Sequence, residues 1–140
     1  MTPTIVHYII FATDGCIRQS GHCDRGTLPK LATLFGDGYA VMEVPEAQYR
    51  LDIDAISYVL DGAIVPKSVA LDVTEFTIRA DGVERVQFAV PAGTSVVHVG
   101  AVVAIEDNVF EFTTDVPGDH RVPFIAPAPF RHFEVTIHAV

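Results

Sequence analysis

Residues Phe133-Glu134-Val135-Thr136-Ile137-His138 alternate apolar and polar side chains, and this stretch indicates the fold most clearly. Similar alternation occurs in three earlier segments, at residues 75–79, 86–90 and 109–113. Turn signals follow those segments, at Asp81-Gly82, Pro91-Ala92-Gly93 and Val116-Pro117-Gly118. Short runs of period two between regularly spaced turns are typical of an antiparallel β-sandwich with one wet and one dry face. The pattern therefore predicts a sandwich over residues 69–140.

The first half of the chain, residues 1–68, predicts a separate module rich in β-hairpins. Residues 5–11 are apolar in both phases apart from His7, and Thr13-Asp14-Gly15 then predicts a turn, because glycine tolerates positive φ. Further strands are expected at residues 16–20, 39–44, 58–60 and 63–65, a polar loop at 21–26, and a helix of one or two turns at 28–35, which Pro29 keeps short. We therefore expect an all-β protein of two domains.

Composition excludes several classes of function. The apolar fraction of 49% is enough for packed cores, and the net charge of −9 comes mostly from residues 69–140, where ten acidic side chains face four basic ones. No basic patch is present to bind nucleic-acid phosphates. No stretch approaches the roughly 20 apolar residues that cross a bilayer, and the N-terminal residues lack the features of a secretory signal. We expect a chain made in the cytoplasm that neither binds nucleic acid nor inserts into membranes.

Ser20, His22 and Asp24 have the side chains of a hydrolytic triad. At every second position of a strand they would share a face but stand about 6–7 Å apart per step. That separation is too long for nucleophile, base and orienting acid to hydrogen-bond in line, and no Gly-x-Ser-x-Gly elbow exposes a nucleophile. We expect no catalytic residues and no enzymatic activity.

Cys16, His22 and Cys23, with His7 on the neighbouring strand, are candidate zinc ligands. Their spacing differs from that of zinc knuckles and ribbons, so ordinary thiols are the better interpretation. Whether Cys16 and Cys23 form a disulfide is left open by the sequence. No metal and no other cofactor is expected.

Other polar groups are interpreted as solvated strand and turn surfaces. His132, Glu134 and His138 fall on the polar face of the last strand, but two histidines six residues apart are separated by about 20 Å, too far to bind one ion together. The acidic pairs Asp52/Asp54 and Glu106/Asp107 lack the further oxygen ligands of a calcium loop.

Two segments of the first half together resemble small tail and tail-fibre-associated proteins of tailed bacteriophages. They are residues 8–21, Tyr-Ile-Ile-Phe-Ala-Thr-Asp-Gly-Cys-Ile-Arg-Gln-Ser-Gly, and residues 58–67, Tyr-Val-Leu-Asp-Gly-Ala-Ile-Val-Pro-Lys. The second half resembles the Ig-like sandwich that often follows such a module, through residues 80–82, 90–94, 110–118 and 133–137. Residues 21–35 are longer than the usual link, and the Ig-like part is small for its class.

The resemblance implies a non-enzymatic structural protein of the virion, present in several copies and packed on other phage tail proteins. An alternative is a module that binds carbohydrate or a host receptor through its loops. A cluster of exposed aromatic side chains at one loop edge would favour the alternative. Most phenylalanines instead occupy the apolar phase of strands, and Phe130 in a loop is the exception.

Residues 5–11 are the segment that we expect to contact other tail proteins. A lone antiparallel sheet normally has one polar face, and a module of about 65 residues buries little of its surface. The predicted docking residues are the apolar side chains of this segment: Ile5, Tyr8, Ile9, Ile10 and Phe11.

Overall fold

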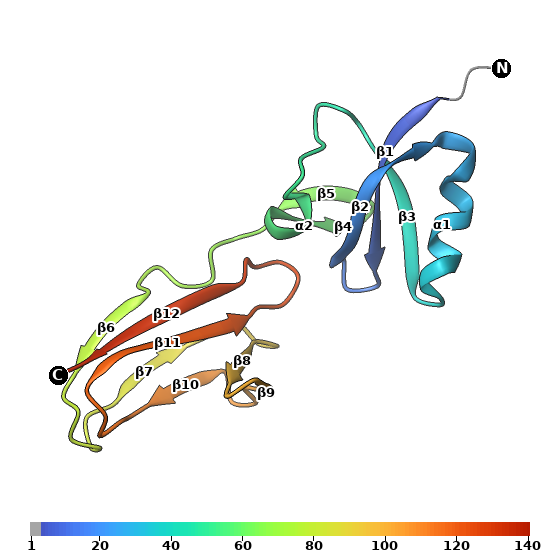
Figure 1. Cartoon of the computed structure of the whole chain (residues 1–140). Helices are drawn as coiled ribbons and strands as arrows, with labels where there is room; N and C mark the ends of the chain where they lie inside the picture. Colours follow the sequence, from blue (N-terminus) through green and yellow to red (C-terminus); the bar gives the residue numbers. More distant parts are fainter. Residues whose placement is uncertain (1–3) are drawn as a thin grey trace. The chain divides into compact units, whose positions relative to one another are not determined.

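The computed structural model describes residues 4–140, except for the side chain of Ala32. The chain divides into two compact units, of which the first ends at Lys67 and the second runs from Ser68 to Val140 (Figure 1). Most of the regular structure in both units is β-strand, so the predicted all-β class is confirmed.

The first unit is built on an antiparallel three-stranded sheet in the order β2-β1-β3. Its strands are β1 (Ile5–Ala12), β2 (Ile17–Asp24) and β3 (Tyr39–Val44). A short 3₁₀ turn, η1 (Arg25–Thr27), and a helix, α1 (Leu28–Phe35), connect β2 to β3. After β3 come the short helix α2 (Ile53–Ile56) and a hairpin of β4 (Ser57–Leu60) and β5 (Ala63–Pro66). β1 is the central strand of the sheet.

One face of this sheet is covered by α2 and the β4–β5 hairpin. Ile9 is fully buried there and packs with Ile17, Val44, Ile53 and Val59. Because β1 pairs with β3 in the register Ile9↔Met42, the side chains of β1 and β3 contribute to the same apolar layer.

The opposite face of the sheet lies under η1 and α1. Arg25 of η1 donates to Glu43 of β3 at 2.8 Å, and the ring of Phe35 at the end of α1 lies 5.4 Å from that of Tyr39. The two layers on opposite sides of β1 explain why residues 5–11 are apolar in both phases.

One local prediction differs from the structure of the first unit, whereas the helix expected at residues 28–35 is present as α1. The expected loop at residues 21–26 is mostly strand, because β2 continues to Asp24 through the pairs His7↔His22 and Ile5↔Asp24. Pro29 lies in the first turn of α1, where its missing N–H breaks no helical bond, and the helix ends at Gly36 with φ 97°.

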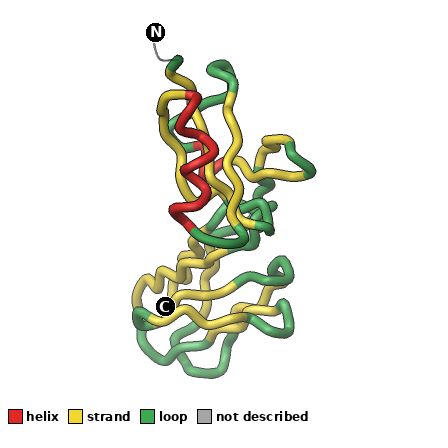
Figure 2. The backbone as a smooth tube through the Cα atoms, turned by 90° about the vertical axis from the view of Figure 1, so that its right-hand side faces the viewer, coloured by secondary structure: helices red, strands yellow, loops and turns green. Residues whose placement is uncertain are grey.

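The second unit contains seven strands in two sheets. They are β6 (Glu75–Ile78), β7 (Val86–Ala89), β8 (Ser95–His98), β9 (Ala101–Ala104), β10 (Val109–Phe112), β11 (Gly118–Ile125) and β12 (Phe133–Ala139). A five-stranded sheet has the order β6-β12-β11-β8-β9, and β10-β7 forms a two-stranded sheet (Figure 1). Figure 2 shows the strands of the chain in yellow and its helices in red. Every strand pair in these two sheets is antiparallel except β6 with β12, which is parallel. The parallel pair departs from the fully antiparallel sandwich predicted.

The core of this unit is aromatic. Phe124, 2% exposed, stacks on Phe133 with ring centres 4.7 Å apart and meets Phe110 edge-on at 4.9 Å. Val135 and Ile137 of β12 are fully buried beside it. The apolar residues of the alternating pattern that predicted β12 therefore face the core, and its polar residues face away from the core.

Candidate functional site

The most unusual surface of the second unit is the β8–β9 hairpin. Its two-residue turn is Val99-Gly100, with φ of 48° and 76°. Such turns normally use Asn, Asp or Gly, because a β-branched side chain is strained at positive φ. Val99 adopts this conformation while 90% exposed, so the strained valine contributes nothing to the core.

The rest of the hairpin is also apolar and open to solvent. Val102 is 61% and Val103 49% exposed, although their side chains point to opposite faces of the sheet. Residues 95–105 contain no Asp, Glu, Lys or Arg. β9 is moreover the terminal strand of its sheet. The chain therefore presents an uncharged, apolar edge without the charges or proline that usually protect such edges.

A cleft lies beside this hairpin, where β8 separates from β11. The two strands pair at Ser95↔Ile125 and Val96↔Phe124 only. The next pair would join Val97 to Pro123, and proline has no N–H to donate, so the ladder ends. The cleft has a volume of about 490 Å³. It is lined by three segments, Val96–Val99, Phe110–Phe112 and Asp119–Val122.

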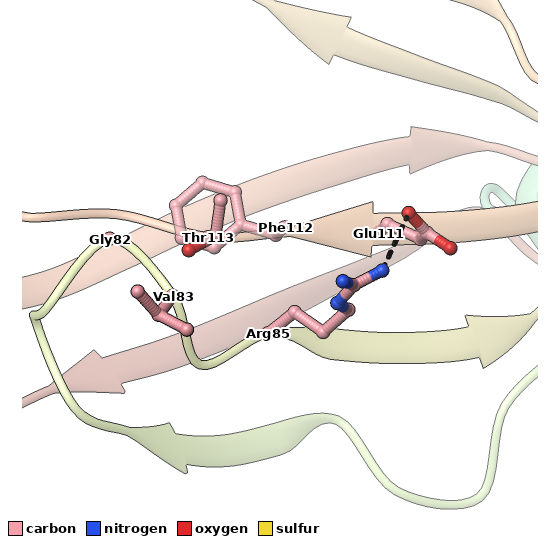
Figure 3. Close-up of a pocket in the computed structure, with 6 residues that line it drawn as sticks. All are labelled: Gly82, Val83, Arg85, Glu111, Phe112 and Thr113. Atoms are coloured by element: carbon pink, nitrogen blue, oxygen red, sulfur yellow. Dashed lines mark ion pairs between the residues drawn. The ribbon is translucent and has the colours of Figure 1, made fainter.

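Another hollow of about 490 Å³ lies on the β7–β10 sheet (Figure 3). Arg85 reaches across it to Glu111, with Nη1 3.7 Å from Oε2, and both side chains are more than half exposed. The remaining lining residues are Gly82, Val83, Phe112 and Thr113, none of which is a nucleophile paired with a base. The ion pair is a surface contact that is screened by solvent.

The solvent-facing side of the five-stranded sheet carries a charged cluster of His138, Asp119 and Glu75. Nδ1 of His138 lies 2.6 Å from Oδ1 of Asp119 on β11, and Nε2 lies 3.6 Å from Oε1 of Glu75 on β6. The pKa of His138 is raised, first by its hydrogen bond to Asp119. The cluster joins three neighbouring strands through side chains.

The structure does not join the predicted triad residues. Ser20, His22 and Asp24 lie along one face of β2, opposite Ile9, His7 and Ile5 of β1. No hydrogen bond recorded for the described residues links the three side chains to one another. The three residues therefore stand at alternate positions along one strand, the arrangement that the spacing argument against a triad assumed.

The candidate zinc ligands are also dispersed. His7 and His22 face each other with ring centres 6.4 Å apart, whereas Cys23 pairs with Val6 and so points to the other face. Cys16 and Cys23 are free thiols, and burial, followed by the charge of Asp24, raises the pKa of Cys23. Within residues 4–140, no group of three or more His, Cys, Asp or Glu side chains is placed to hold a metal ion.

His7 has a structural environment of its own. Its ring stacks on Tyr49 at 4.0 Å, and its Nδ1 is buried without a hydrogen-bond partner among the described residues. This stacking belongs to the layer that covers the sheet of the first unit.

The predicted docking segment requires a correction. Tyr8, Ile9 and Ile10 are 7%, 0% and 0% exposed, and Phe11 packs against the cluster around Ile9. Both edges of β1 are occupied by β2 and β3. The prediction assumed that so small a module could not cover both faces, but α1 and the β4–β5 hairpin do so. Ile5, 60% exposed, is the one predicted docking residue with an open side chain.

The remaining candidates have local roles. His132 precedes β12 instead of lying on it, and its Nδ1 accepts the N–H of Ala126, whereas Glu134 and His138 lie within the strand. Asp52 pairs with Arg50 at 3.4 Å, and Asp107 accepts the N–H of Val109 in a turn.

The aromatic side chains do not gather on a loop edge. Phe130 is half-buried in the turn that bridges to Ser68. Phe35 is the aromatic residue among the exposed large hydrophobic side chains of the described chain, at 38%, and it lies on α1. Nothing in this arrangement favours the glycan-binding alternative.

Comparisons of this chain with protein families, curated proteins and solved structures gave no match. Among the helices of the described residues, none has the length and apolar character needed to cross a membrane.

Proposed function

We propose that this chain is a non-enzymatic structural component of a bacteriophage tail, a tail or tail-fibre accessory protein that packs on other virion proteins. The resemblance of residues 8–21 and 58–67 to such proteins supports the assignment. The observation that carries the docking role is the exposed β8–β9 hairpin with Val99 at its tip.

The hairpin is suited to contact with protein. Contiguous exposed apolar side chains are unfavourable in water and mark surfaces that become covered in an assembly. Beside the hairpin, Asp119 and Arg121 of β11 have no strand partner on the cleft side among the described pairings. Their backbone groups are available to a strand of another protein, a common mode of recognition.

The assignment is tested in purified particles of the phage that encodes the chain. Mass spectrometry is expected to find the chain in tails, and Val99→Asp is expected to lower its amount there without lowering its melting temperature. Val73→Asp, at a 57% exposed position of the same unit, is the matched control and is expected to leave incorporation unchanged. Absence of the wild-type chain from tails would refute the tail assignment.

A further inference from the structure

We propose that β9 pairs with β9 of a second copy of this chain, antiparallel and about a twofold axis at Val103. The inference rests on the proposed structural role, in which several copies meet in one particle. The proposed structural role does not say what covers the exposed edge of β9. The pairing proposed here identifies that partner as a second copy of the chain.

The hydrogen-bonding pattern of the hairpin shows which backbone groups are free. The Ile105 N–H donates to Thr94 O at 3.1 Å, and the ladder closes at His98↔Ala101. Pairs in an antiparallel ladder alternate between bonded and non-bonded. The backbone N–H and C=O groups of Ala101, Val103 and Ile105 therefore point to β8. Those of Val102 and Ala104 point outward, away from the sheet.

With a twofold axis perpendicular to the sheet at Val103, all of these outward N–H and C=O groups form hydrogen bonds to the second copy. Val102 of each copy then lies opposite Ala104 of the other, and each such pair exchanges two N–H···O bonds. Val103 lies opposite its own counterpart in a non-bonded pair, where the side chains of antiparallel strands approach most closely. The same patch meets itself, as a closed dimer requires.

Charge also favours a second copy at this edge. Copies with a net charge of −9 repel one another over most of their surface. Residues 95–105 carry no formal charge with histidine neutral, so pairing here brings no like charges into direct contact. Pairing would cover Val102 and Val103, which are 61% and 49% exposed in the single chain.

Sedimentation of the full chain over a range of concentrations tests the pairing. The wild type is expected to show a monomer–dimer equilibrium. Ala104→Pro removes an outward N–H that the β8 ladder does not use, and Val102→Lys adds a charge to the edge; both are expected to abolish the dimer. Val73→Lys, also at an exposed valine, is expected to retain it. Circular dichroism melts verify that each variant is folded.

A cross-link tests the position of the axis. In a chain with Cys16→Ser and Cys23→Ser, Val103→Cys is expected to form an intermolecular disulfide on mild oxidation. Val73→Cys in the same background is expected to form much less. A wild type that stays monomeric, or a dimer that survives both Ala104→Pro and Val102→Lys, would overturn the pairing. A monomer that still enters tails would refute self-pairing alone, whereas a dimer absent from tails would refute the tail assignment alone.

Discussion

Asp119 and His138 face each other across β11 and β12, with Oδ1 of the carboxylate 2.6 Å from Nδ1 of the imidazole. Glu75 on β6 approaches the other ring nitrogen at 3.6 Å. A protonated His138 therefore lies between two carboxylates, on a sheet face whose other residues include Arg121, Thr77 and Thr136. The hydrogen bond to Asp119 is the main reason that the pKa of His138 is raised above 6.5.

The stability of the folded chain is expected to depend on pH through His138. Because the folded-state pKa is raised, the stabilisation is complete below the unfolded value of about 6.5 and is lost as pH rises through the folded value. Urea unfolding at a series of pH values should show the free energy of unfolding falling over that window. His138→Gln should remove this dependence, and His98→Gln should retain it. An NMR titration of His138 at or below its ordinary pKa would contradict the expectation.

Phe124 is expected to be the most sensitive core position of the second unit. Its ring contacts those of Phe133, Phe110 and Phe88. Phe124→Ala removes these contacts and leaves a cavity, which should cost about 3–5 kcal/mol. Phe35→Ala, at a partly exposed ring of the first unit, is the comparison and should cost much less. Denaturant unfolding measures both, and equal losses would contradict the packing.

Gly15 is expected to reject a side chain for two reasons. Its φ is 88°, and a Cβ there would overlap the backbone oxygen of Val59. Gly36 also has positive φ, 97°, but open space around it. Gly15→Ala should therefore lower the melting temperature well beyond Gly36→Ala, because only the first adds a clash with backbone. Similar shifts for the two variants would show that the contact with Val59 gives way.

Ile9 and Ile5 lie on the same strand, β1, but the side chain of Ile9 is buried and that of Ile5 is exposed. Ile9→Asp places an unpaired carboxylate among fully buried side chains, so we expect the first unit to unfold. Ile5→Asp, at a 60% exposed position of the same strand, should leave the melt nearly unchanged. Far-ultraviolet circular dichroism checks both. A folded Ile9→Asp variant would mean that the layer over Ile9 opens readily, and would restore β1 as a docking candidate.

In the second unit, the strands that the sequence predicts are those with one face toward the core and one toward solvent. β6, β7, β10 and β12 alternate in period two, and the Asp-Gly and Pro-Ala-Gly turns mark their ends. β8 and β9 are apolar in both phases, so no alternation marks them. β11 carries Pro123 and two charged side chains, which disfavour a strand in isolation. Its pairing with β12 overrides that local preference.

Residues 5–11 and 95–105 have the same pattern with opposite outcomes. Both are apolar in both phases, but β1 is central and covered on each face, whereas β9 is terminal and exposed. Position within a sheet depends on pairing between distant segments, which periodicity does not report. For the same reason the contact of His138 with Asp119 could not be read from the sequence, since it depends on the register of β11 with β12.

The parallel pairing of β6 with β12 has a consequence for how the chain is made. β6 is the first strand of its unit to leave the ribosome, yet its partner is the last, and the pair Thr136↔Glu75 joins residues 61 positions apart in the sequence. Closing so long a loop is slow compared with forming a hairpin. Nascent chains of this unit therefore cannot form the β6–β12 pair until the last strand of the unit has been made.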